Sequence, residues 1–537
     1  MKIQPQYDVV IAGGGLSGLC LAIQLERAHP GIRVLVAEKT EHPAPEAAHK
    51  VGESSVEVAS HYFTKTLGLS DLLDNQLPKF GLRFFMQHGE NVDIAARLEC
   101  GPSHYLDVPS FQIDRGSFEN ELARRARQAG IHFADRCPVG KIELGSGGRD
   151  HRVQLKLSTG HIWVDCRWVV DASGRTALLK KSLDLGRSNR HQVNAAWFRF
   201  DAAIDIDDWS QNPEWRTRHR VSRRLSTNHL LGEGYWVWLI PLPNDRTSIG
   251  IVVDDHLHPF SRLSNFEKAL AWLDQHEPQC ANVVREHLHR RMDFRALKNY
   301  SHDVKQALSA ERWCITGDAG LFVDPFYSPG SDFIGIANGF VTDLIRRDLD
   351  GEPIDGLAET YDQTFRSIGR TFLVTYHRQY TLMGNPRVMV LKIVWDFVMY
   401  WGGIALLFCH DRMHDPDFMK RSQPMLHGFA TANVRMQAFF RTWHSFSKEE
   451  PPVPVQSFVD YAEIPFLAKL NRELLLETDD EAVLTLLENN VRLARELQIE
   501  IVAEASRHNA KLPPGVTLPT TNHLAEVFAR LYSEGSV

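Results

Sequence analysis

Tyr7-Asp8-Val9-Val10-Ile11-Ala12-Gly13-Gly14-Gly15-Leu16-Ser17-Gly18 is the stretch that decides the fold of this chain. It begins as a short apolar strand, turns through consecutive glycines and continues into residues 19–28, which have the apolar pattern of a helix. The next apolar run, residues 33–37, ends at Glu38, about 20 residues beyond the last glycine. Strand, glycine turn, helix, strand and acid, in this order, predict a nucleotide-binding βαβ unit.

The glycines of this turn have separate physical roles. Gly13 makes the tight turn, Gly15 lets the backbone approach a pyrophosphate, and Gly18 lets the helix pack closely on the strand. The start of the helix offers free N–H groups to the phosphates, and Glu38 is placed to accept a hydrogen bond from a ribose hydroxyl. The expected nucleotide contacts in this unit are Gly13, Gly15, Ser17, Gly18, Glu38 and Lys39.

Two later strand ends indicate that the nucleotide is FAD. Residues 168–171 form an apolar strand that ends in a tight turn at Asp171, and residues 314–316 form a second strand that ends at the pair Gly317-Asp318. Both resemble the flavoprotein monooxygenases and their relatives, in which the Gly-Asp pair holds the ribityl chain. Residues 111–130 look like the helix that follows the first sheet excursion in that family. The resemblance implies FAD contacts at Arg115, Asp171, Gly317 and Asp318.

The composition limits the other classes of protein. The chain has 537 residues, 43% of them hydrophobic, and a formal net charge of -7, so it has no overall basic field for nucleic acid. Its seven cysteines form no C-x-x-C pair and no signal peptide precedes the first strand, so we expect reduced thiols in a cytoplasmic protein. Lys392 and Asp396 interrupt the apolar run 388–409, which predicts a buried core helix or the wall of an apolar channel rather than a membrane span.

The remaining segments predict the domain organisation. Residues 80–112 and 185–300 contain short apolar and aromatic runs, which predict an antiparallel sheet, and the chain becomes helix-rich from about residue 346. We therefore predict an α/β fold with a Rossmann-like FAD-binding domain of the flavoprotein monooxygenase type over residues 1–345. The inserted sheet makes this domain discontinuous and forms the substrate region. Residues 346–537 are expected to form a helical C-terminal domain that covers the substrate pocket.

Within the predicted sheet, residues 236–241 read Trp236-Val-Trp238-Leu-Ile-Pro241. Residues two apart on a strand share a face, so both indoles project to one side and a rigid proline follows. Together with the FAD motifs, this W-x-W-x-I-P sequence resembles the flavin-dependent halogenases, and the resemblance covers about residues 5–345. Three further features agree: the turn Gly52-Glu53 after the strap that senses the flavin, Lys79 where the family places its catalytic lysine, and Phe322 to Gly330, which match the signature F-x-x-P-x-x-S-x-G.

The resemblance implies a reaction and its participants. Reduced FAD and oxygen oxidise chloride or bromide to hypohalous acid, and Lys79 directs this acid to an aryl substrate. Trp236 and Trp238 keep the organic substrate away from the flavin chemistry. Backbone N–H groups of Gly330 and Ser331 bind the halide, and Tyr327 and Ser328 of the signature are expected catalytic residues. Gly52, Glu53 and Gly330 are further expected FAD contacts. Because the sequence contains no second dinucleotide fingerprint, we expect a separate flavin reductase as partner.

Two positions depart from the family pattern. Tyr327 stands where the tryptophan-acting branch has a glutamate, which favours an electron-rich phenol or pyrrole as substrate. Pro329 follows Ser328 and has no N–H, so a halide site made from successive amides loses one donor, worth about 1.5–3 kcal/mol. This loss favours the alternative of a halogenase-like flavin monooxygenase or dehydrogenase that uses no halide. A sensor or scaffold function of the C-terminal helices is a third alternative.

Two charged groups have open interpretations. A basic cluster and a second pair of arginines are either solvated faces or a docking surface for an acidic carrier protein that delivers a tethered aryl group. These residues are Arg216, Arg218, Arg220, Arg223 and Arg224, with Arg290 and Arg291. His410 and His414 have the spacing of zinc ligands on a helix, but the glutamate of H-E-x-x-H is missing. We expect them to close the apolar run 388–409 and expect no metal.

Overall fold

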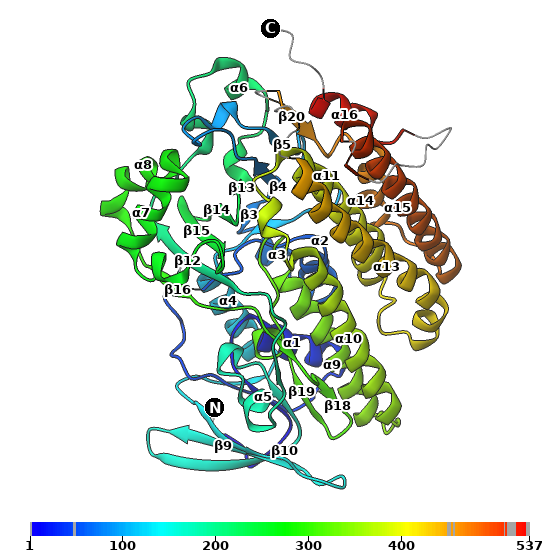
Figure 1. Ribbon diagram of the computed structural model, residues 1–537. Coiled ribbons are helices and arrows are strands. Elements are labelled where there is room, and N and C mark those ends of the chain that lie inside the picture. Colours follow the sequence, from blue (N-terminus) through cyan, green and yellow to red (C-terminus); the bar gives the residue numbers. More distant parts are fainter. Residues whose placement is uncertain are drawn as a thin grey trace. The chain divides into compact units, whose positions relative to one another are not determined.

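The computed structural model describes residues 3–46, 50–447, 450, 453–454, 457–509, 511–512 and 522–532. The chain divides into two compact units, each built from three separate segments (Figure 1). Unit 1 contains residues 1–76, 113–190 and 301–372, and unit 2 contains residues 77–112, 191–300 and 373–537. The helices after Phe372 belong to the same unit as the inserted sheet.

Unit 1 is built on a sheet whose central strands are parallel. These are, in spatial order, β19 (Trp313–Ile315), β10 (Gly160–Asp171), β1 (Gln6–Ala12), β2 (Val34–Ala37) and β7 (His132–Ala134). β18 (Leu308–Ser309) joins one edge antiparallel, while β8 (Val139–Glu143) and β9 (His151–Leu157) extend β10 as the antiparallel ribbon at the bottom of Figure 1. The register aligns Ala12 with Asp171, and Asp171 with Ile315. Three of the motifs predicted from the sequence therefore begin at one edge of one sheet.

Helices enclose this sheet. They are α1 (Leu16–Ala28), α2 (Glu57–His61), α3 (Ser70–Leu73), α4 (Arg115–Gln128), α5 (Leu178–Ser182), α9 (Gly330–Leu349) and α10 (Asp355–Tyr376), whose last residues pass into unit 2. All residues of α1 from Leu16 to Leu25 are buried, because this helix packs against both α4 and α9. α4 begins after Asp114, whose carboxylate accepts hydrogen bonds from the N–H groups of Gly116 and Ser117, as expected of an N-cap.

Unit 2 contains a second, eight-stranded sheet. Its strands are, in spatial order, β16 (Arg295–Leu297), β12 (Val193–Phe200), β15 (Arg246–Asp254), β14 (Tyr235–Leu242), β13 (Thr227–Gly232), β4 (Leu82–Phe85), β5 (Glu99–Gly101) and β20 (Phe458–Asp460). Most neighbours are antiparallel, as predicted, but β13 pairs with β4 and β20 with β5 in parallel. These two pairs join segments that are far apart in the chain, so no short turn sets their direction. One face packs on α7 (Phe266–His276) and α8 (Pro278–Glu286), through a core that includes Phe198, Tyr235 and Trp272.

The C-terminal part of unit 2 is helical. α11 (Pro386–Met399) continues through a π-helical turn into α12 (Leu406–Cys409) and packs against α13 (Pro416–Phe446), α14 (Pro465–Glu473) and α15 (Asp480–His508); α16 (Ala525–Tyr532) follows. Among the described residues, the run Pro386–Cys409 is long and apolar enough to cross a membrane, but 83% of its most apolar window is buried inside the protein. Within it, Lys392 donates hydrogen bonds to Asp396 and to the carbonyl oxygen of Thr375. Because α11 is buried from Arg387 to Val398, we interpret it as a core helix, the first of the two predicted alternatives.

Candidate functional site

The glycine turn after β1 has the geometry of a phosphate cradle. Gly13 has φ +118°, and a Cβ atom there would lie 2.3 Å from the carbonyl oxygen of Ala172. A Cβ at Gly18 would lie 2.0 Å from the carbonyl oxygen of Gly13, so neither position accepts a side chain. At Gly15 the nearest atom to such a Cβ is 3.9 Å away, on Glu119, which leaves open space at the start of α1. The turn is therefore tight beneath and open above, as a bound pyrophosphate requires.

Glu38 is buried at the end of β2 and is held from two sides. One carboxylate oxygen accepts a hydrogen bond from the N–H of Gly14 at 2.7 Å, and the other accepts from the N–H of Thr40 at 2.8 Å and from its hydroxyl. These bonds fix the carboxylate beside the glycine turn, where the ribose was expected. Lys39 is exposed, with Nζ 3.5 Å from the hydroxyl of Thr176 in the turn after β10.

The two other strand ends meet the glycine turn. Asp171 is buried, and its carboxylate accepts from the N–H of Ser173 at 3.0 Å and from that of Leu179 at 2.7 Å, which closes the turn after β10. Gly317 has φ +59°, and a Cβ there would lie 3.0 Å from Cβ of Ser17. The hydroxyl of Ser17 is 3.0 Å from that of Thr316. The turn at Gly317 therefore lies directly on the first turn of α1.

Asp318 follows this glycine and has an accessible side chain. The pKa of its carboxyl is nevertheless raised, because desolvation by the surrounding protein outweighs the opposing positive charges of Arg115, Arg175 and Lys180. An accessible carboxylate in a dehydrated, positively charged setting is typical of a group that faces a recess for a polar ligand.

The segment that contains the turn Gly52-Glu53 is held by hydrogen bonds from Arg115 of α4. Gly52 has φ +90°, and Arg115 donates hydrogen bonds to the carbonyl oxygens of Val51, at 2.8 Å, and Gly52. Arg115 also donates to the buried carboxylate of Glu119, which forms an ion pair with Lys50. Arg115 and Lys50 lower the pKa of Glu119 against the opposing effect of burial.

Glu119 and Lys50 were not predicted from the sequence. They are 69 positions apart in the chain, and on sequence alone each resembles a surface charge. Glu53 is buried, and its carbonyl oxygen accepts from the N–H of Ile113 at 2.6 Å.

The signature segment leads into the start of α9. Ser328 has φ +61°, a left-handed conformation that is uncommon for serine, and its N–H donates to the carbonyl oxygen of Pro325 at 2.8 Å. Pro329 is the N-cap of α9, and no side chain of the described residues caps this end. The proline removes one of the four N–H groups that a helix start leaves without an intrahelical partner, and those of Gly330, Ser331 and Asp332 stay. The carboxylate of Asp332 accepts from the N–H of Ala59 at 2.9 Å. Tyr327 is half-buried, and its ring contacts Phe326.

In unit 2, Trp236 and Trp238 share one face of β14, as predicted, with ring centroids 5.7 Å apart. Both are buried. The indole N–H of Trp236 donates to the hydroxyl of Tyr380 at 3.0 Å, and that of Trp238 donates to the hydroxyl of Ser248 at 3.2 Å. This face is opposite to the one that packs on α7 and α8, because Tyr235 and Val237 project into that core.

A histidine that the sequence analysis missed belongs to the same face. His229 of β13 is paired in register with Trp238, and its ring contacts Trp236 at 5.5 Å and stacks on Phe84 at 4.8 Å. Together these rings form a continuous buried aromatic wall.

Lys79 is buried, with only 3% of its surface exposed. It follows β3 (Leu77–Pro78), which pairs with β6 (Phe111–Gln112). Its N–H donates to the carbonyl oxygen of Ser110 at 2.8 Å, and the N–H of Phe80 donates to that of Leu225 at 2.9 Å. The main chain is therefore held on both sides, which fixes the position of this lysine inside unit 2.

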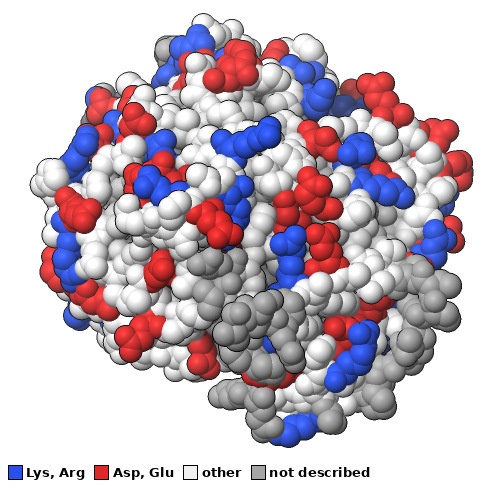
Figure 2. Space-filling view, turned by 90° about the horizontal axis from the view of Figure 1, so that it is seen from above, with Lys and Arg blue, Asp and Glu red and all other residues white. Residues whose placement is uncertain are grey.

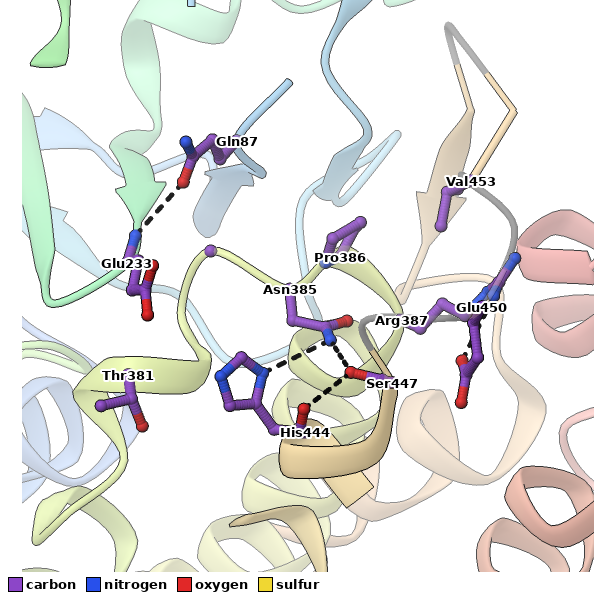
Figure 3. Close-up of a pocket in the computed structure, with 11 residues that line it drawn as sticks. Gln87, Glu233, Thr381, Asn385, Pro386, Arg387, His444, Ser447, Glu450 and Val453 are labelled. Atoms are coloured by element: carbon purple, nitrogen blue, oxygen red, sulfur yellow. Dashed lines mark hydrogen bonds and ion pairs between the residues drawn. The ribbon is translucent and has the colours of Figure 1, made fainter. Parts of the chain in front are cut away.

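Unit 2 also contains a polar cavity of about 320 Å³ at the start of α11 (Figure 3). Asn385 caps α11 through the N–H of Val388 and also lies within hydrogen-bonding distance of Ser447 and His444. The lining residues are Gln87, Glu233, Thr381, Gly384, Asn385, Pro386, Arg387, His444, Ser447, Glu450 and Val453. Aryl ligands prefer sites lined by apolar and aromatic groups, so this cavity does not have the chemistry of an aryl pocket.

Part of the basic cluster is buried, while Arg216 and Arg220 are exposed. Arg223 is 1% exposed and donates to Glu99 and Asp207, and Arg218 also pairs with Glu99. Glu99 is fully buried, and Arg83 and His219 contact it as well. Burial raises the pKa of Glu99, but the surrounding positive groups hold it well below its usual range.

The outer arginines of the cluster also have acidic neighbours. Arg216 pairs with Asp208 and Arg224 with Asp245, while the second group has Arg290 beside Asp201. In Figure 2, which views the end of the molecule where α6 (Pro213–Thr217) lies in Figure 1, basic and acidic side chains alternate. Most of these arginines therefore neutralise acids of the same chain, and their number is no evidence of a docking surface.

The two histidines near residue 410 and the cysteines have the following places in the structure. His410 and His414 lie in turns after α12, and His414 contacts Asp411, so they close the apolar run instead of sharing a helix face. The described residues contain no group of three or more metal-ligating side chains. All seven cysteines are free thiols, and all except Cys409 are buried.

Comparison with known proteins agrees with this geometry. Residues 6–325 match the model of a family described as an FAD binding domain. A flavin-dependent halogenase, chlA, of Dictyostelium discoideum is 25% identical over 433 residues, which cover 74% of this chain and 69% of that protein. A brominase of 1H-pyrrole-2-carbonyl peptidyl-carrier protein from Pseudoalteromonas luteoviolacea (strain 2ta16) is 25% identical over 64% of this chain and 78% of its own length.

A solved structure has the same fold. The crystal structure of halogenase PltM in complex with phloroglucinol and FAD superposes with a TM-score of 0.63 at 17% sequence identity, and covers 91% of this chain and 96% of that one.

Proposed function

Because this chain belongs to the flavin-dependent halogenase family, we propose that it uses chloride or bromide to halogenate an electron-rich aryl substrate of the phenol or pyrrole type. When bound, reduced FAD supplies, with oxygen, the two-electron oxidation of the halide to hypohalous acid. The flavin comes from a separate reductase, and we place the reaction in the cytoplasm. The observation that carries the proposal is the buried aromatic wall of Trp236, Trp238 and His229 together with the buried Lys79 in the same unit, because lysine side chains are seldom buried.

The residues of unit 1 account for cofactor binding. The open space above Gly15 and the free N–H groups of α1 suit the pyrophosphate, Glu38 suits the ribose, and Asp318 suits the ribityl chain. Arg115 holds the strap at Gly52. We propose that Lys39, Glu53 and Asp171 complete this site from its edges.

We propose that the halide binds at the start of α9. Gly330 and Ser331 present N–H groups there, and the positive end of the helix dipole attracts an anion. The left-handed turn at Ser328 places the chain for this helix start, and Tyr327 lies beside it. Pro329 weakens the site by one donor without removing it.

In the proposed reaction, Trp236 and Trp238 screen the aryl substrate from the oxidant. Their hydrogen bonds to Tyr380 and Ser248 fix both indoles, so the barrier is rigid. The ammonium of Lys79 donates a hydrogen bond to hypohalous acid and makes its halogen more electrophilic. Alternatively, its neutral amine attacks the halogen, the bond between oxygen and halogen breaks, and a haloamine forms with release of water. A phenol or pyrrole ring is electron-rich enough to react without the glutamate that Tyr327 replaces.

The experiment is product analysis by mass spectrometry with FAD, a flavin reductase, bromide or chloride, and a panel of phenols and pyrroles. We expect products that have exchanged hydrogen for halogen. Lys79→Ala should lower aryl halogenation by about 10²–10⁴-fold, the usual contribution of a proton-transfer or hydrogen-bonding group. A chemical trap should still detect free hypohalous acid.

Lys305→Ala, which removes an exposed lysine, serves as the matched control and should keep full activity. Products that gain oxygen from the wild-type enzyme, with no halogen, would support the monooxygenase alternative. Carrier-bound substrate that reacts while the free acid does not would support the carrier hypothesis.

A further inference from the structure

Lys180 is a buried lysine in unit 1 that the sequence motifs do not include. It lies in α5, directly after the turn closed by Asp171, and is 9% exposed. Its Nζ donates a hydrogen bond to the carbonyl oxygen of Gly320 at 2.8 Å and lies 3.0 Å from Nδ1 of His302. A protonated amine only donates, so Nδ1 of His302 accepts and the proton of the neutral ring is on Nε2.

These contacts join three segments that come from distant parts of the chain. Lys180 belongs to the segment after β10, and Gly320 ends the turn that begins at Gly317. His302 forms an isolated bridge with Phe322, in which each N–H donates to the other's carbonyl oxygen, at 2.9 and 3.1 Å. Phe322 is the first residue of the signature that leads to α9. One side chain therefore links both turns expected to hold FAD to the start of the signature.

Burial and the surrounding charges determine the protonation of both side chains. Burial lowers the pKa of Lys180 to about 8, although Asp171, Asp303 and Asp318 act to raise it; Lys181 lowers it further. Burial, followed by the charge of Lys180, lowers the pKa of His302 to about 4, with a smaller effect of Arg175. The pair is therefore a charged lysine beside a neutral histidine at pH 7.

We propose that Lys180, acting with His302, is a positioning residue for the flavin, because its protonated amine holds the turn Gly317–Gly320 in the conformation that binds FAD. The proposal rests on FAD binding, not on the halogenation proposed above. The residue is not part of the catalytic machinery, since its amine donates to the backbone of the turn and to the ring of His302.

The test is FAD binding to the full-length protein, measured by quenching of flavin fluorescence in Lys180→Met. We expect Kd to rise roughly tenfold to a hundredfold, as for the loss of one hydrogen bond to a charged group. Lys181→Met is the matched control, because it removes the same charge from the exposed neighbour. That variant should bind FAD within twofold of the wild type, and an equal loss in both variants would overturn the proposal.

The melting temperature of the FAD-free protein separates positioning from a structural role. Lys180→Met removes the cost of burying a charge but leaves the carbonyl of Gly320 without its donor, and these effects oppose each other. We expect little change in melting temperature together with weak FAD binding. A large loss of stability with FAD affinity in proportion, or an unchanged Kd, would show that Lys180 has only a structural role.

The pH dependence of the wild type provides a second measurement that needs no variant. FAD affinity should fall as pH rises through about 8, where Lys180 loses its proton. The stability of the FAD-free protein should depend on pH in the opposite direction. Because the pKa of Lys180 is lower in the folded than in the unfolded state, the unfolded state binds more protons above pH 8. The contribution of Lys180 to stability therefore rises with pH. An FAD Kd that stays constant between pH 7 and 9.5 would overturn the proposal.

Discussion

Gly250→Ala tests the rigidity of the aromatic wall in unit 2. Gly250 is paired with Trp238 across β14 and β15, and a Cβ atom there would lie 2.1–2.3 Å from three carbons of the indole ring. Real Cβ atoms do not approach so closely, so the indole of Trp238 must shift. The shift weakens its hydrogen bond to Ser248, which is already 3.2 Å long.

The magnitude follows from two opposing effects. Alanine in a strand is favoured over glycine by about 0.5–1 kcal/mol, because the unfolded chain has less conformational freedom. Overpacking of a dense core costs about 1–3 kcal/mol. We expect a net loss of about 1–2 kcal/mol, which lowers the melting temperature by a few degrees. Gly186→Ala is the matched control, since no atom lies within 4 Å of a Cβ there, and it should be neutral or slightly stabilising.

The assay combines thermal unfolding of both variants with product analysis. If Trp238 screens the aryl substrate, its displacement should also increase the fraction of oxygenated aryl product relative to halogenated product. A Gly250→Ala protein that melts at or above the wild-type temperature would refute the packing argument. A destabilised variant with an unchanged product ratio would retain the packing argument and reject the screening role of this indole.

Three further results are expected. Glu99→Gln should destabilise the protein by about 3–5 kcal/mol, measured by chemical denaturation, because it leaves buried arginines without their counter-charge. Since the folded pKa of Glu99 is well below the unfolded value, its contribution should be complete above about pH 4.3 and decrease as pH falls further. Burial lowers the pKa of His276 to about 4, so the melting temperature should fall between pH 6.5 and 4 as the unfolded state takes up the proton. His276→Phe should flatten this dependence of melting temperature on pH, and an unchanged slope would contradict the assignment to His276. Pro329→Ala restores an N–H at the start of α9 and should lower the KM for halide roughly tenfold or more, whereas an unchanged KM would indicate that the halide binds elsewhere.

The FAD-binding unit could be predicted from the sequence because its determinants are local. Gly13 and Gly18 cannot carry a side chain where they lie, and this requirement is visible in the spacing of a dozen residues. The acid at the end of β2 and the Gly-Asp pair after β19 follow from the same topology, because parallel strands bring their carboxyl ends to one edge.

The features that were missed depend on partners far along the chain. The side chain of Lys180 is explained by Gly320 and His302, more than 100 positions away, and the arginines near residue 220 are explained by Glu99. A sequence shows that such residues are charged but not whether they are buried. For the same reason the arginines within 216–224 resembled a docking face. In the structure, most of them form ion pairs with acidic side chains of the same chain.

The discontinuous units explain why buried charge occurs at these places. The chain passes between the two units five times, so each unit must assemble from three pieces. Apolar contacts favour any compact arrangement of those pieces, whereas a buried charge without its partner costs several kcal/mol. Arg223 with Glu99, and Arg97 with Glu277, each join two segments of unit 2, and Lys180 with His302 joins two segments of unit 1. These pairs therefore disfavour misassembled arrangements more strongly than they stabilise the native one. Replacing both Arg97 and Glu277 with apolar residues should cost less stability than replacing either one alone, but should slow refolding or lower its yield.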